Sequence, residues 1–454
     1  MGKMKNVFYI FLLDVILLLL FICNQAEAMT EGGGRIFSLD DCMSYAVRHN
    51  TDINKRKYTN DDYRINKKAA VAALLPSASL SVTAGSSYGR TIDPSTNTYS
   101  NTGHFSNEYS ASSSMPLFCG FRHINGIRAA RYMCLSGEAV LQKVKDETAI
   151  AVMQAYFDVV YYSKSAVIAG RQLGTSQKLL FKSKKQFDLG IASRADVAQM
   201  QSQVAAGELL LVQQENFRDL ALLHLKEKMN YPQDDTLVVD TLYAADLRTK
   251  KVSVYAILDY AMKNNPGILA AGYAVENERM NLRVAKGGMA PSLYLYGGYS
   301  TNYYKNLNDG KIHLPFKTQF REHRRYYWEF SLSIPLFGGL SYRKNAVQAR
   351  NSLKISMQER MRTRQELNTE VRRAIMERNG YAEEYMSALK KEESAREAFE
   401  LAAGQFEKGL VSSIDLRTAS DNLLKAGADR LKAELQYAER CRLVSYYGGT
   451  PLVK

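Results

Sequence analysis

The sequence has few of the features that mark an enzyme or a helical membrane protein. After the first thirty residues no stretch of eighteen uninterrupted apolar residues occurs, so we expect no later helix to cross a bilayer, and any later crossing must use strands. The six histidines are scattered, and HExxH, GxSxG and P-loop patterns are missing. We therefore expect no enzyme activity, no catalytic residues, no metal site and no cofactor.

Paired cysteines and a concentrated basic region are also missing. Of the five cysteines one lies in the first thirty residues, and the other four show no CxxC spacing, which predicts buried single thiols rather than a disulfide framework. The formal net charge is +14, but the basic residues alternate with acidic ones, as in residues 390–393. That pattern is typical of solvated helix faces, so we expect no nucleic-acid partner.

The N-terminus carries a signal for export. Basic residues precede an apolar run over residues 7–22, and a small-x-small motif follows it; this predicts a signal peptide over residues 1–28. A transmembrane anchor is the alternative, but the run is interrupted by Asp14 and is shorter than the roughly 20 residues of a span. A lipoprotein signal with Cys23 as the lipidated residue is a third interpretation, although the preceding Ile22 is bulky for that motif.

The rest of the chain is an internal duplication, with two copies of one sequence unit. The early matches hold an offset of 215 residues and the later ones an offset of 219, so four residues were inserted in the second copy, around residues 305–325. We expect an exposed loop there. The matches are Pro76-Ser77 with Pro291-Ser292, Pro116-Leu-Phe-x-Gly120 with Pro335-Leu-Phe-x-Gly339, and Phe187-x-x-Gly190-x-x-Ser193-x-x-Asp196 with Phe406-x-x-Gly409-x-x-Ser412-x-x-Asp415.

The distribution of the nine prolines predicts long helices. None lies between Pro116 and Pro232, and none between Pro335 and Pro451. Because proline disrupts helix interiors, each window can be helical throughout. A glycine turn divides each window into two antiparallel helices. A helix of nearly seventy residues would be roughly 100 Å long, too long for one compact domain.

Four segments with period two predict strands, at about 78–90, 106–117, 292–304 and 326–336. A small soluble sandwich is one interpretation. The strand lengths, the export signal and the lack of a second set of strands favour a membrane barrel. Four strands cannot close a barrel, a dimer's eight would be filled inside, and a trimer's twelve would leave a lumen. The residues expected to face lipid are Leu80, Val82, Trp328, Phe330, Leu332 and Ile334.

The predicted fold class is mainly α with a membrane β-barrel. The expected segments are the signal peptide (1–28), a first structural repeat (29–232), a connecting segment (233–252) and a second structural repeat (253–454). Each repeat contains a helix, two strands and a long helical pair.

With these motifs in this order, twice, the chain resembles the TolC family of outer-membrane efflux proteins from about Phe37 to Leu452. The resemblance implies a homotrimer with a twelve-stranded barrel in the outer membrane and a helical tunnel in the periplasm. It implies an exit duct of a tripartite efflux pump or a type I secretion system. The implied partners are a periplasmic adaptor (membrane fusion) protein, an inner-membrane transporter and outer-membrane lipid. The transported substrate and the class of pump stay open.

The resemblance also implies where the functional sites lie. Asp415, with Asp196 as its counterpart, would line the periplasmic entrance, although both residues also fit helix capping. A second aspartate often follows one turn later in the family, where this chain has Thr418. Some members lock the entrance with a tyrosine and an arginine, where this chain has Phe406 and Val411, so the gating stays open. The tips that would contact the adaptor are Leu189, Gly190, Ile191, Gly409 and Leu410; for the glycines, capping is an equal explanation.

A second function class fits part of the pattern. A trimeric coiled-coil surface or structural protein, anchored by a small β-barrel, would also need long helices and a few strands. Two matched strand pairs per chain favour the duct, and ion conductance would distinguish the two.

Overall fold

The computed structural model describes residues 36–93, 97–241, 253–307 and 314–453. The predicted signal peptide with Cys23 lies outside these residues, and so do residues 242–252 of the connecting segment and 308–313 of the loop with the insertion. The chain divides into two compact units. The sheet unit comprises residues 57–140 and 266–363, and the helical unit comprises the rest.

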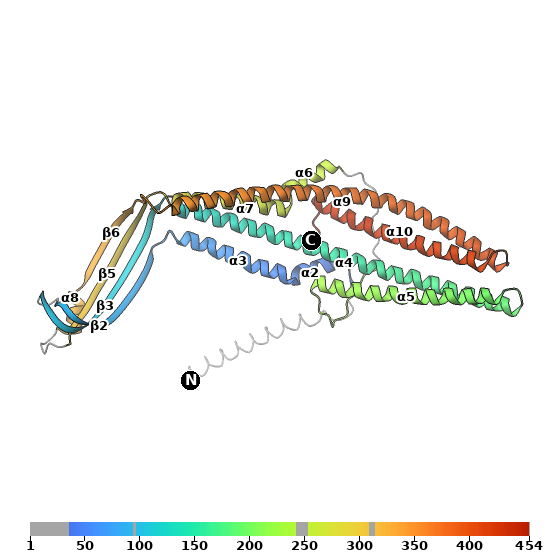
Figure 1. Ribbon diagram of the computed structural model, residues 1–454, viewed down its shortest axis with the longest axis horizontal. Helices are drawn as coiled ribbons and strands as arrows, with labels where there is room; N and C mark the ends of the chain where they lie inside the picture. Colours follow the sequence, from blue (N-terminus) through green and yellow to red (C-terminus); the bar gives the residue numbers. More distant parts are fainter. Residues whose placement is uncertain (1–35, 94–96, 242–252, 308–313, 454) are drawn as a thin grey trace, which may run out of the picture. The chain divides into compact units, whose positions relative to one another are not determined.

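The sheet unit contains one antiparallel sheet with the strand order β2-β3-β5-β6 (Figure 1). Its strands are β2 (Ser77–Asp93), β3 (Thr98–Cys119), β5 (Ser292–Asn306) and β6 (Arg325–Ser333). β6 ends before Ile334, which was expected inside a strand reaching residue 336. β6 is an edge strand, so nothing in this sheet pairs with its second side, and Pro335 offers no N–H to extend the ladder.

The register gives the sheet two different faces. Leu80 pairs with Ala111, Ala111 with Tyr299, and Tyr299 with Tyr326; we call the side that carries these residues the apolar face. On the opposite, polar face, the hydroxyl of Ser77 lies 2.8 Å from that of Ser114. The Ser79 and Ser112 hydroxyls lie 2.9 Å apart in the same way. Alternation in each strand is thus kept in phase across all four strands.

The Pro-Leu-Phe-x-Gly motif marks the turn that leads from strand to helix in each repeat. Gly120 and Phe121 have φ values of +57° and +60°, and Gly339 and Leu340 have +56° and +67°. Two consecutive left-handed residues kink the chain between strand and helix, and glycine supplies the first without strain. A Cβ on Gly120 would lie 2.4 Å from the carbonyl oxygen of Gly287, so close backbone approach also requires glycine there.

The helices of the sheet unit are joined by buried side-chain to backbone hydrogen bonds. α4 (Arg122–Asp188) contributes residues 122–140, beside α3 (Thr51–Ala72) and α7 (Pro266–Gly287). Asn60 of α3 donates to the carbonyl of Gly137 at 3.1 Å, and Asn277 of α7 donates to that of Ala129 at 2.8 Å. Both asparagines are buried, so these bonds fix α4 between its two neighbours.

The helical unit is built from α2 (Leu39–His49), α5 (Arg194–Met229), α6 (Val254–Asn264), α10 (Ser413–Tyr447) and parts of α4 and α9 (Ser341–Glu407). Figure 1 shows α4 beside α5 and α9 beside α10, as two helical hairpins. Their core is apolar and continuous: Met43, Tyr156, Leu225 and Leu431 are each at most 3% exposed. A short parallel pairing of β1 (Ile36–Phe37) with β4 (Val238–Val239) lies beside this core.

Two further expectations from the sequence concern membrane-spanning helices and the cysteines. In the described residues, no helix combines the length and the apolar character that a bilayer crossing requires. The described cysteines are free thiols. Cys42 is fully buried, and this burial raises the pKa of its thiol to about 12, which keeps it protonated and unreactive.

Candidate functional site: the tips of the two helical hairpins

The two long helices end in the same glycine turn. Gly190 after α4 and Gly409 after α9 have φ values of +75° and +70°. Next in the chain, Ile191 and Leu410 each donate an N–H to the carbonyl five residues earlier, at 2.8 and 3.0 Å. This is the Schellman motif, in which glycine satisfies the last helical carbonyls at no steric cost. The glycines expected at the adaptor-contacting tips therefore cap the helices.

Each turn leads directly into a capped helix. Ser193 begins α5 and Ser412 begins α10, and each hydroxyl accepts the N–H of the aspartate three residues later. The aspartates return the bond: Asp196 accepts from the Ser193 N–H at 3.0 Å, and Asp415 from the Ser412 N–H at 3.3 Å. Both aspartates thus form capping boxes, which is one of the two roles expected for them.

Asp196 also joins the two hairpins. Its second carboxylate oxygen accepts a hydrogen bond of 2.7 Å from the hydroxyl of Ser413, at the start of α10. Hydrogen bonds from Ser193, and then from Ser413, lower the pKa of Asp196 below its ordinary value. Ser413 belongs to none of the repeated motifs. The only signal was that the first repeat has Arg194 at the matching position.

An apolar cluster holds the hairpins together behind the turns. Phe406 is 6% exposed and packs with Leu179, Met200 and Leu416, so all four helices contribute. Its counterpart in the first repeat, Phe187, is 45% exposed. The duplicated motif is therefore not used symmetrically, because only the second copy turns its phenylalanine into the contact between hairpins.

Polar contacts reinforce this cluster. Lys182 of α4 forms an ion pair with Glu407 of α9, and Gln186 donates to the Glu407 carbonyl at 3.3 Å. Farther from the turns, Gln203 of α5 donates to Asp421 of α10 at 3.0 Å. These bonds are exposed and individually weak, but together with the cluster they fix which residues of the two tips lie side by side.

The tips nevertheless leave large apolar side chains in water. Leu189 is 75% exposed, Ile191 68%, Leu410 71% and Ile414 65%. Four such side chains at the ends of two hairpins exceed the scattered apolar residues normal for a surface. The arrangement fits contact with another protein.

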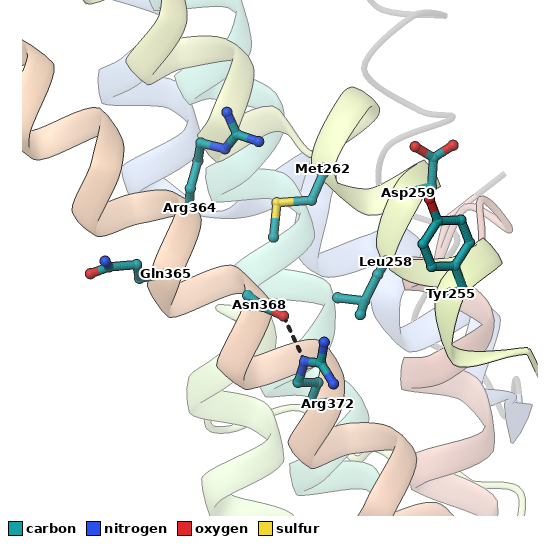
Figure 2. A pocket seen from close by; sticks show the side chains of 8 residues that line it. All are labelled: Tyr255, Leu258, Asp259, Met262, Arg364, Gln365, Asn368 and Arg372. Atoms are coloured by element: carbon teal, nitrogen blue, oxygen red, sulfur yellow. Dashed lines mark hydrogen bonds between the residues drawn. The ribbon is translucent and has the colours of Figure 1, made fainter.

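A hollow lies between α6 and α9 in the helical unit. It encloses about 440 Å³. Figure 2 shows Leu258 and Met262 of α6 facing Arg364 and Asn368 of α9. Asn368 accepts from Arg372 at 2.8 Å, and nearby Asp259 accepts from Lys263 at 2.8 Å. These contacts leave a shallow groove of mixed polarity, without a convergent set of groups for chemistry.

The residues expected to face lipid lie on one side of the sheet. Leu80 and Val82 of β2 are 75% and 59% exposed, and Trp328, Phe330 and Leu332 of β6 are 74%, 59% and 61% exposed. Leu295 and Gly297 of β5 pair with Phe330 and Trp328, which places both strands' apolar residues on the apolar face. Ile334 is 56% exposed, just beyond β6.

No chemistry-bearing cluster accompanies these surfaces. Throughout residues 36–93, 97–241, 253–307 and 314–453, no group of three or more His, Cys, Asp or Glu side chains is arranged to hold a metal ion. The candidate site is therefore a pair of helix tips with capped aspartates and exposed apolar side chains.

Comparison with known proteins places these features in a family context. The model of a family described as outer membrane efflux protein matches residues 43–230 and 257–449, one match for each repeat. The outer membrane protein TolC of Vibrio cholerae is 26% identical over 297 residues, which are 63% of this chain and 66% of that protein. The match thus spans slightly less than two thirds of the length of TolC.

Solved structures match more of the chain. The outer membrane protein VceC from Vibrio cholerae has a TM-score of 0.77 at 13% identity, over 91% of this chain and 96% of VceC. CusC has a TM-score of 0.75 at 18% identity, over 91% of this chain and 92% of CusC. These likenesses confirm the predicted fold class.

Proposed function

Because this chain belongs to the outer membrane efflux protein family, we propose that three copies form a passive exit duct through the outer membrane. The duct serves a tripartite efflux pump or a type I secretion system. A periplasmic adaptor and an inner-membrane transporter supply the substrate and the driving force. The protein is not an enzyme on this proposal, since a passive duct needs no chemical step.

The observation that carries the proposal is a sheet with one apolar face and two edges without strand partners in the described chain. β2 and β6 are the outer strands, and the apolar face exposes Leu80, Trp328 and Phe330. In lipid, unpaired strand edges leave backbone groups without hydrogen bonds at a cost of several kcal/mol each. Pairing β6 of one chain with β2 of the next removes both edges. Three chains give twelve strands, enough for a lumen.

The polar face supports a water-filled lumen. Serines on β2 and β3 bond across the strands at 2.8 and 2.9 Å, and Glu329 and Arg325 of β6 alternate with the apolar residues. A barrel closed with the apolar face outward would direct these groups inward, toward water.

The tips support a docking role at the periplasmic end. Leu189, Ile191 and Leu410 are exposed beside capped, hydrogen-bonded turns, so a partner would meet a preorganised apolar surface. We assign the adaptor contact to these three residues, with Gly190 and Gly409 holding the turns.

Asp415 is the stronger candidate for the entrance. In Asp196 one carboxylate oxygen accepts the capping hydrogen bonds of α5, and the other accepts a hydrogen bond from Ser413. In Asp415 only one oxygen accepts capping hydrogen bonds, and the residue is exposed. Three copies of Asp415 in a narrow mouth would attract cations and repel anions.

Planar bilayer recordings test both proposals. The purified trimer should give stable channels, and Asp415→Asn should reduce their cation selectivity, because the carboxylates that attract cations are removed. Asparagine keeps the carbonyl oxygen that caps α10, so the fold should persist. The control is Asp219→Asn, an exposed residue on α5 away from the tips. A trimer without conductance would support the anchored surface protein instead, whereas a water-soluble monomer would refute both functions.

A further inference from the structure

The outer ends of two strands carry the same short motif. Tyr88-x-Arg90 on β2 and Tyr303-x-Lys305 on β5 are 215 residues apart, the offset of the first part of the duplication. Arg90 and Lys305 are exposed. Alternation places all four side chains on the apolar face, where Leu80 also lies. In each repeat a cation therefore follows a tyrosine toward the outer end of the strand.

A short helix adds cations to this end of the sheet. α8 (Phe316–Glu322) lies beside β5 (Figure 1). The Phe316 and Phe320 rings lie 6.2 and 5.3 Å from that of Tyr109, and Thr301 donates to the Phe320 carbonyl at 2.7 Å. Val82 pairs with Tyr109, and Tyr109 with Thr301, so α8 packs on the apolar face.

The cations of α8 lie about 100° around the helix from these rings, because each directly follows a phenylalanine. Lys317 and Arg321 are one helical turn apart and exposed, while Phe316 and Phe320 contact the sheet. The acidic neighbour Glu322 lies 3.6 Å from Arg321, with both side chains more than half exposed, so this pair neutralises little. Arg90, Lys305, Lys317 and Arg321 together form what we call the basic rim.

The spacing along β5 sets the depth of the rim. Leu293 and Tyr303 lie ten residues apart on β5, which is about 33 Å along the strand and about 25 Å of depth at a tilt near 40°. That equals the height of the apolar band of a membrane barrel. Tyr303 and the α8 rings then lie at the outer interface, where aromatic side chains are enriched, and Lys305 lies at headgroup depth. Lys305 pairs with Phe105, and Phe105 pairs with Ser86, so Arg90 lies four strand positions farther out.

We infer that the basic rim binds the phosphate groups of a phosphorylated glycolipid of the lipid A type in the outer leaflet. The inference rests on the proposed function, because it requires the apolar face to lie in the outer membrane. Two observations favour this ligand: the positive charge of the basic rim complements phosphate, and the rim lies at the depth of the lipid headgroups. Guanidinium and ammonium groups bond to phosphate oxygens, while the rings beneath them contact acyl chains.

The test uses the full-length trimer in nanodiscs and in bilayers. Binding of bis-phosphorylated lipid A is compared with that of fully dephosphorylated lipid A, and inorganic phosphate is added as competitor. The test variant replaces all four basic-rim residues by glutamine. The control variant replaces four exposed cations of helices in the same unit by glutamine: Lys67, Lys68, Arg343 and Lys344.

Wild type and control should prefer the phosphorylated lipid, and the basic-rim variant should lose at least tenfold of that preference, since each cation near a charged surface contributes about fivefold. Equal loss in the control, or none in the basic-rim variant, would overturn the inference. Full competition by inorganic phosphate would show a free-phosphate site instead. Normal channels without a lipid preference would refute the inference alone, whereas absence of channels would refute the duct and, with it, the inference.

Discussion

The asymmetry between the two repeats gives the sharpest prediction. Phe406→Ala removes a ring that is 6% exposed in the cluster with Leu179, Met200 and Leu416. Such truncations cost about 3–5 kcal/mol in a rigid core. The cluster is small and near the helix ends, where collapse is easier, so we expect about 2–4 kcal/mol. The matched control is Phe187→Ala, the same motif position in the first repeat, which is 45% exposed and should cost below about 1 kcal/mol.

Hydrogen exchange measures this difference locally. Opening of the tips exposes the amides of the turns that follow α4 and α9, so a loss of about 3 kcal/mol should speed their exchange by roughly 150-fold. Amides of the α2–α4 core, around Met43 and Tyr156, should be unaffected. Equal acceleration in the two variants, or none in Phe406→Ala, would refute the view that, of the two motif phenylalanines, only Phe406 contributes to the contact between hairpins.

Three further outcomes follow from the geometry. The pKa of Asp196 is lowered in the folded protein, so the ionised carboxylate stabilises the tips fully above the unfolded pKa of about 3.9. This stabilisation is lost as the pH falls through the lower folded pKa. Tip amides should therefore exchange faster at pH 2 than at pH 5, after correction for intrinsic rates. Gly409→Ala should destabilise the tip by about 1–2 kcal/mol, because φ is +70° although nothing crowds the site; an equally protected turn would contradict this. Trp328→Lys should lower the stability of the trimer refolded into bilayers by up to about 2–4 kcal/mol, while Glu329→Lys, on the polar face, should change it little; equal losses would argue against the assigned faces.

The sequence by itself determined the elements and their repetition. Proline positions, period-two segments and the glycine turns are local signals, because they act through backbone sterics and side-chain alternation. They were sufficient for the fold class, for the family and for the presence of the four long strands. They did not show that β3 begins at Thr98 instead of about residue 106, or that the loop expected around residues 305–325 contains α8. The sequence does not predict that β6 ends before Ile334, because this end depends on the position of the strand at an edge of the sheet.

Only the tertiary structure decided which copy of a repeated motif residue contacts the other hairpin. Phe187 and Phe406 occupy the same position of the repeated motif, and so do Asp196 and Asp415, yet one member of each pair contacts the other hairpin and the other does not. Likewise, nothing local indicates that α8 packs on the apolar face beside Tyr109. Contacts between segments distant in the chain depend on how the elements pack, so two copies of one motif can pack differently when their neighbours differ.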